Sequence, residues 1–243
     1  MAALAFVLSA ALAAVHVFAG SVRLLGGIPR SRWLSFGGGI SVAYIFIHLL
    51  PELAAGQRML ESTGGSLLAA IESQLWLVAL GGLVTFYGLE RVGKHSRRQT
   101  SAGGAPQGTD ARVFWLHIGS FAIYNLVIGY LMLDRAAQGV GNLLLFWFAM
   151  VLHFFVNDVG LRDHHRERYT RMGRWVLALA VLGGWLLGVT VEVGEAAVAV
   201  LVAFIGGGVV LNVMKEELPE ERSSSFVAFA LGASAYAAVL LAM

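Results

Sequence analysis

Cysteine is absent from the 243 residues of this chain. Its absence excludes disulfides, thiolate metal sites and cysteine nucleophiles. Charged residues are also scarce: they make up 13% of the chain, whereas soluble domains carry about a quarter. Hydrophobic residues account for 58%, and the mean hydropathy is +0.74. This composition is typical of a polytopic membrane protein, with the lipid bilayer as its main partner.

The net charge is small, at +2, although the isoelectric point lies near 9.2. In a membrane protein the basic residues usually report orientation rather than nucleic-acid binding. No stretch of the sequence resembles a nucleic-acid-binding module, so we expect no nucleic-acid partner.

Eight segments are apolar and long enough to cross a bilayer, which takes about 20 residues in a helix. We therefore predict an all-α membrane protein with a single polytopic domain over residues 1–243. Glycine and alanine are abundant in these segments, and the glycine runs "FGGGI" and "IGGGVV" are best explained by close helix packing. The predicted spans are 2–21, 33–53, 67–90, 113–133, 139–160, 173–191, 196–215 and 224–243.

Basic residues collect in alternate connections between these spans. The loops after the first, third and fifth spans are rich in arginine and lysine, and the loops after the second, fourth and sixth have at most one. Because lysine and arginine favour the cytoplasmic side, we expect both termini to lie outside. The long polar segment 91–112 is then a cytoplasmic loop.

The span over 139–160 carries the most polar residues, in "FAMVLHFFVNDVG". His153 and Asn157 are four residues apart and therefore share one face of a helix, about 40° apart around the axis. Asp158 lies about 140° from His153. Imidazole, amide and carboxylate groups are all ligands for divalent cations, but the same groups can simply bond neighbouring helices. Both interpretations stay open.

The span over 113–133 contains Asn125 in its middle, where the amide must find a partner within a bundle. Its neighbour Gly129 would let another backbone or an ion come near. His117 lies close to the membrane edge, where a histidine needs no function. The segment "LRDHHRERY" (161–169) has adjacent histidines that point about 100° apart on a helix, so we expect a solvated cytoplasmic loop.

The span over 33–53 ends in "YIFIHLLPELAAG", where His48 and Glu52 share one helical face around Pro51. Proline removes a backbone hydrogen bond, so this pattern is consistent with a helix that ends at the outer interface. The alternative is that His48 and Glu52 attract a cation at the mouth of a pathway.

These features together resemble the ZIP family of divalent metal transporters. The likeness extends over nearly the whole chain: eight spans, both termini outside, the longest loop after the third span, and "HLLPEL", "FYGLER" and "GGGVVLNVMKEELPEE" in that order. The resemblance implies a ZIP-like helix bundle that moves a divalent cation inward.

The resemblance also implies a reduced metal site. The family motif His-Asn-x-x-Asp/Glu-Gly corresponds to "YNLVIG" (124–129), and His-Glu-x-x-His-Glu corresponds to "HFFVND" (153–158). The residues that remain as candidate ligands are Asn125, His153, Asn157 and Asp158. One aspartate cannot offset the four positive charges of a two-metal site in a low dielectric, so we expect one cation.

Three functions therefore compete. The first is a transporter of a divalent cation such as Zn2+, Fe2+ or Mn2+, which is not an enzyme and holds no firm cofactor. The second is a ZIP-like scaffold that binds or regulates without transport. The third is an intramembrane metal-dependent hydrolase, which would need three firm ligands and a general base. We expect a bacterial inner (plasma) membrane location, and the oligomeric state, including a homodimer, stays open.

Overall fold

A computed structural model describes residues 1–18, 30–63, 74–102, 111–217 and 225–242. Within these ranges the chain is almost entirely helical and contains no strand, so the predicted all-α class is confirmed. Residues 19–21, 67–73, 224 and 243 of the predicted spans and residues 103–110 of the predicted loop lie outside the described part. Among the described residues, five helices are long and apolar enough to cross a membrane: Ser35–Leu60, Leu75–Val92, Ala111–Ala137, Val140–Arg162 and Tyr169–Thr190.

The described residues form eight helical segments, and each overlaps one of the predicted spans. Three further apolar helices among the described residues are shorter than the five that are long enough to cross a membrane. The segments are α1 (Ala2–Phe18), α2–η2–α3 (Arg30–Tyr44, Ile45–Leu49 and Leu50–Thr63), α5 (Leu75–Ala102), α6 (Ala111–Ala137), α7 (Val140–Arg168) with the turn η3 (Tyr169–Gly173), α8 (Arg174–Thr190), α9 (Glu195–Glu217) and α10 (Phe226–Leu241).

The helix that contains Pro51 does not end there, contrary to the prediction; it continues as α3 to Thr63. The reason is the π-helical turn η2, in which the Leu50 N–H bonds to the Ile45 carbonyl. A widened turn of this kind changes the backbone pairing just ahead of the proline, which has no N–H to contribute.

Two predicted loops are also partly or wholly helical. α5 extends through residue 102 into the predicted loop 91–112, since lysine, arginine and glutamine are good helix formers. The segment 161–169 continues α7, and the π-helical turn η3 joins it directly to α8. The prediction of a solvated loop at 161–169 is therefore wrong.

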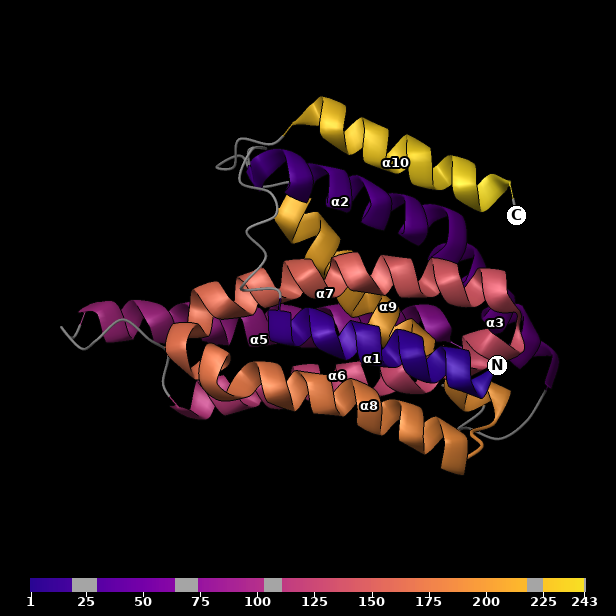
Figure 1. Ribbon diagram of the computed structural model, residues 1–243, viewed down its shortest axis with the longest axis horizontal. Coiled ribbons are helices and arrows are strands. Elements are labelled where there is room, and N and C mark those ends of the chain that lie inside the picture. Colours follow the sequence, from indigo (N-terminus) through magenta and orange to yellow (C-terminus); the bar gives the residue numbers. More distant parts are fainter. Residues whose placement is uncertain (19–29, 64–73, 103–110, 218–224, 243) are drawn as a thin grey trace. The chain divides into compact units, whose positions relative to one another are not determined.

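The chain divides into two compact units. Unit 1 consists of Met1–Arg23 and Gly88–Glu192. In this unit α1 and α6 each pack against both α7 and α8, and Figure 1 shows α1 between these two helices. The Trp147 indole N–H on α7 donates to the Leu8 carbonyl on α1 at 3.0 Å.

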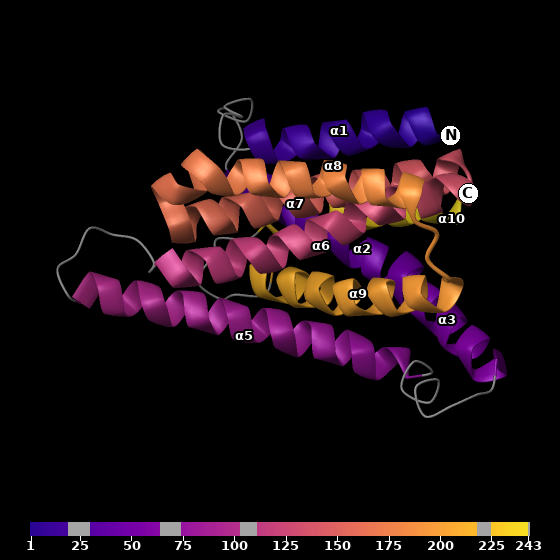
Figure 2. The same cartoon turned by 90° about the horizontal axis from the view of Figure 1, so that it is seen from below.

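Unit 2 consists of Leu24–Tyr87 and Val193–Met243. In this unit α2 runs beside α10 (Figure 1), and α9 packs against α2 and α3. The first half of α5 lies along α9 (Figure 2). The Gln57 side-chain oxygen accepts a hydrogen bond from the Leu75 N–H at 2.8 Å, which ties α3 to the start of α5.

Reciprocal glycine contacts hold three helix pairs together. A Cβ on Gly39 would lie 2.1 Å from the Phe229 carbonyl oxygen, and one on Gly232 would lie 2.1 Å from the Phe36 carbonyl oxygen. Only glycine permits such close backbone approach, which supports a packing role for the glycine runs. The same reciprocal arrangement joins α5 to α9 through Gly82 and Gly207, and α6 to α8 through Gly129 and Gly184.

Candidate functional site

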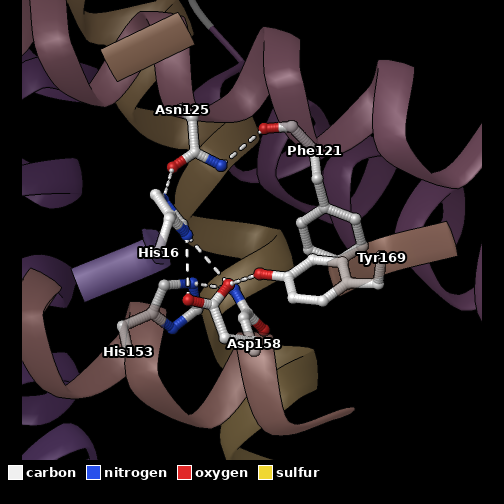
Figure 3. Close-up of polar contacts among 7 residues, drawn as sticks. His16, Phe121, Asn125, His153, Asp158 and Tyr169 are labelled. Carbon is white, nitrogen blue, oxygen red and sulfur yellow. Dashed lines mark hydrogen bonds and ion pairs between the residues drawn. The ribbon is translucent and has the colours of Figure 1, made fainter. Parts of the chain in front are cut away.

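A histidine on α1 lies at the centre of a buried polar network in unit 1. The Nδ1 atom of His16 is 2.8 Å from Oδ1 and 3.0 Å from Oδ2 of Asp158 on α7. Its Nε2 atom is 2.8 Å from Oδ1 of Asn125 on α6. Figure 3 shows the imidazole ring between the amide and the carboxylate. His16 is 2% exposed, Asn125 1% and Asp158 2%, so three helices converge on a site closed to solvent.

The sequence of α1 explains why His16 points inward. Ala5, Ser9, Leu12 and His16 recur at helical spacing and form the buried face of the helix, whereas Phe6 and Phe18 are exposed. Ser9 and His16 are polar and lie seven residues apart on one stripe of an otherwise apolar helix. This pattern is the signal that sequence reasoning missed. An inward polar stripe on an apolar helix predicts a partner in the bundle.

The hydrogen bonds of Asn125 determine which groups donate. Its amide N–H donates to the Phe121 carbonyl at 2.7 Å, so its oxygen faces His16. Nε2 of His16 must then carry a proton and donate to that oxygen. Nδ1 faces the Asp158 carboxylate, so both ring nitrogens of His16 take part in hydrogen bonds.

Asp158 receives a further hydrogen bond from the hydroxyl of Tyr169, which donates to Oδ1. Tyr169 begins the turn η3, so the tight connection between α7 and α8 brings the phenol back to the carboxylate. Tyr169 is 4% exposed. The carboxyl group therefore has two side-chain hydrogen-bond partners, as a buried polar group requires.

His153 is the centre of a second small network on the same helix as Asp158. Its Nε2 atom is 2.8 Å from the Tyr124 hydroxyl and 2.9 Å from the Asn157 amide nitrogen. Phe154 is fully buried and lies beside both imidazoles, with ring centroids 4.5 Å from His16 and 6.3 Å from His153. The two networks are therefore neighbours within one core.

The four predicted ligands come together in unit 1, although not around one point. Asn125 and Asp158 lie on opposite sides of His16, whereas Asn157 and His153 bond each other. An ion that contacts both Asn125 and Asp158 would first have to displace the ring between them. Within the described part of the chain, no group of three or more His, Cys, Asp or Glu has the arrangement of a metal site. Gly129, which could admit a backbone or an ion, packs on the Val181 carbonyl of α8.

His48 and Glu52 lie in unit 2 and share one helical face, as their spacing requires. Their closest atoms, Nε2 and Oε2, are 4.0 Å apart, and the side chains are 21% and 28% exposed. The π-helical turn η2 carries His48, and Tyr44 stacks beside it with ring centroids 5.4 Å apart. Their role at the mouth of a pathway stays a prediction.

Comparison of the chain with protein-family models, with curated proteins and with solved structures gives no significant match. The function is therefore argued from the residues themselves.

Proposed function

We propose that this protein is a ZIP-like membrane transporter for a divalent cation of the zinc, iron or manganese class. The observation that carries the proposal is the buried Asp158 carboxylate on α7, which bonds His16 of α1, the same ring that bonds Asn125 of α6. A buried ionisable group in a membrane protein is costly. By default it therefore indicates an ion pathway or another functional site rather than a packing contact.

The chemistry of this network suits a cation. His16 and Tyr169 bond the oxygens of the carboxylate, and a metal ion would take over the same lone pairs with a greater positive charge. Metal ligation by imidazole requires the ring nitrogen to be deprotonated, so cation binding here releases a proton. His16 would supply the imidazole that the family motif has at the position of Tyr124.

The small number of candidate ligands favours transport of a cation over its tight binding. Once the His16 ring moved aside, one carboxylate, His16 or His153, and the amide oxygens of Asn125 and Asn157 would make a weak site for one cation. Transport requires an ion to leave as readily as it enters, so weak binding is compatible with conduction. The zinc, iron and manganese ions share these ligand preferences, and availability decides among them.

The test is uptake of Zn2+ and Mn2+ into vesicles that contain the purified protein. We expect saturable uptake that falls at least tenfold in Asp158→Asn and in His153→Ala. Asp134→Asn is the matched control, because Asp134 is a partly exposed carboxylate near the end of α6 that bonds Gln138. It should leave uptake within about twofold of wild type, because removal of a charge at the rim of a site has only a small effect.

A folded wild-type protein without uptake above that of empty vesicles would contradict the transporter proposal. Equal uptake in wild type and Asp158→Asn would contradict the assignment of the pathway to this network. Size-exclusion profiles and thermal unfolding of each variant separate these results from misfolding.

One observation favours a second candidate, a ZIP-like scaffold that does not transport. The His16 ring lies between Asn125 and Asp158 and bonds both, so the described network is internally satisfied. Such a protein would show no uptake of either metal, and Asp158→Asn would change its stability only.

A further inference from the structure

A second histidine pair lies in unit 1, away from the network around His16. His117 on α6 and His165 on α7 are 2% and 3% exposed. His165 follows Asp158 by two helical turns, about 10 Å along α7, and His117 precedes Asn125 by about 12 Å along α6. Apolar side chains fill part of this distance: Phe114, Ile118, Leu161, Tyr169 and Leu177 form one buried cluster.

The two imidazoles face each other through single nitrogen atoms. Nδ1 of His117 is 3.1 Å from Nε2 of His165, and the rings are nearly perpendicular, at 85° with centroids 5.1 Å apart. Phe114 packs edge-on against His165, with centroids 5.3 Å apart, which limits rotation of that ring.

The other nitrogen of His117 fixes its tautomer. Nε2 donates to the backbone carbonyl of Leu89, which belongs to the part of α5 within unit 1. In the neutral ring Nδ1 then has no proton, and its lone pair points at His165 and can accept a hydrogen bond or bind a metal. Histidines that ligate metals usually donate their second N–H to a carbonyl or carboxylate in this way, because the bond sets both tautomer and orientation.

The separation of the two nitrogens is close to that in a metal site. Metal–nitrogen bonds of about 2.0–2.1 Å in a tetrahedral site put two ligand nitrogens about 3.3 Å apart. Small rotations of the rings would therefore turn a shared hydrogen bond into a two-point chelate. Paired imidazoles select borderline cations such as Zn2+ or Cu2+ over Mg2+ or Ca2+.

We infer that His117 and His165 form a second binding site, for one zinc- or copper-class cation, with water completing the coordination. The site is separate from Asp158 and does not depend on the proposed transport. By the predicted orientation, the start of α6 and the end of α7 face the cytoplasm. Sequence reasoning set these residues aside, because it placed His117 at a membrane edge and compared His165 only with its neighbour His164.

The test uses the full-length protein with a purification tag that contains no histidine. The Asp158→Asn background removes the carboxylate of the first network. Calorimetric titration with Zn2+ alone then measures the Zn2+ binding that does not depend on this carboxylate. We expect one equivalent of Zn2+ to bind, and we expect its affinity to fall at least tenfold in His117→Gln and in His165→Gln. His95→Gln is the matched control, since His95 is an exposed histidine on α5, and it should leave the affinity unchanged.

Three results would overturn the inference: no Zn2+ binding in the Asp158→Asn protein, an unchanged affinity in His165→Gln, or an equal loss in His95→Gln. Should both histidine variants fail to fold, the paramagnetic resonance spectrum of Cu2+ added at one equivalent to the Asp158→Asn protein decides. Coupling to two imidazole nitrogens supports the site, and coupling to none refutes it. Neither readout requires uptake, so failure of this site and failure of the proposed transport are separate results.

Discussion

Both units contain a histidine–carboxylate pair, and the two pairs differ in sequence separation, in the distance between their closest atoms and in exposure. In unit 1, His16 and Asp158 are 142 residues apart in sequence, their closest atoms are 2.8 Å apart, and the side chains are 1% and 2% exposed. In unit 2, His48 and Glu52 are one helical turn apart, their closest atoms are 4.0 Å apart, and they are 21% and 28% exposed.

The difference shows how the environment determines what a pair contributes. A buried charge that loses its partner remains in a low dielectric without compensation, whereas a partly hydrated charge is stabilised by water. Breaking the first pair should therefore cost more stability than breaking the second.

The largest expected effect comes from breaking the buried pair. His16→Ala leaves Asp158 with Tyr169 as its remaining described donor and should lower the free energy of unfolding by about 3–5 kcal/mol. Titration with a denaturing detergent, followed by circular dichroism, measures the change.

The double variant His16→Ala/Asp158→Asn is the control for this prediction. It removes the charge together with its partner and should recover a large part of the lost stability, because the two sites are coupled. Additive losses in the two single variants and the double variant would mean that the pair does not act as a unit.

Glycine packing predicts a smaller effect that the two units share. A Cβ on Gly184 would lie 1.9 Å from the Leu126 carbonyl oxygen, whereas one on Gly183 would meet nothing within 4 Å. Gly184→Ala should therefore force α6 and α8 apart and cost about 1–3 kcal/mol. Gly183→Ala should be neutral or stabilising by up to about 1 kcal/mol, since alanine favours the helix. Thermal unfolding in detergent compares the two.

The equivalent test in unit 2 uses the adjacent glycines of α5. Gly82 faces the Phe204 carbonyl at 2.0 Å from its added Cβ, and Gly81 has nothing within 4 Å. Gly82→Ala should destabilise as Gly184→Ala does, with Gly81→Ala as the control. A loss in one unit without the other would show that the glycine contacts are not equivalent, and the two units would then differ in packing as well as in polarity.

Sequence reasoning found the helices because each one is a long apolar run, a property local to its segment. It also selected Asn125, His153 and Asp158, since polar residues are conspicuous within such runs. It missed His16, because a single histidine near the end of an apolar helix has no local partner, and its carboxylate lies 142 residues away. It ended one helix at residue 53, just after Pro51, and others in basic segments, where a π-helical turn or good helix formers continue them.

The hydroxyl of Tyr169 predicts a smaller effect within unit 1. Tyr169→Phe removes one donor from the Asp158 carboxylate while His16 remains in place. Polar interactions between membrane helices contribute about 1 kcal/mol, so the unfolding free energy should fall by about that amount. Tyr87→Phe is the control, because Tyr87 is 49% exposed. A loss as large as that of His16→Ala would make Tyr169, rather than His16, the principal partner of the carboxylate.

The smallest expected effect belongs to the pair in unit 2. His48→Ala should change the unfolding free energy by less than about 1 kcal/mol, because the Glu52 side chain is 28% exposed and its closest oxygen is 4.0 Å from His48. If these residues attract cations at a pathway mouth, uptake should fall about twofold at low Zn2+ and remain unchanged at saturation, since a local charge raises the encounter rate only. Uptake that falls equally at both concentrations would place His48 among the groups that move the ion. A stability loss equal to that of His16→Ala would remove the distinction between the two pairs, and burial would then not be what separates them.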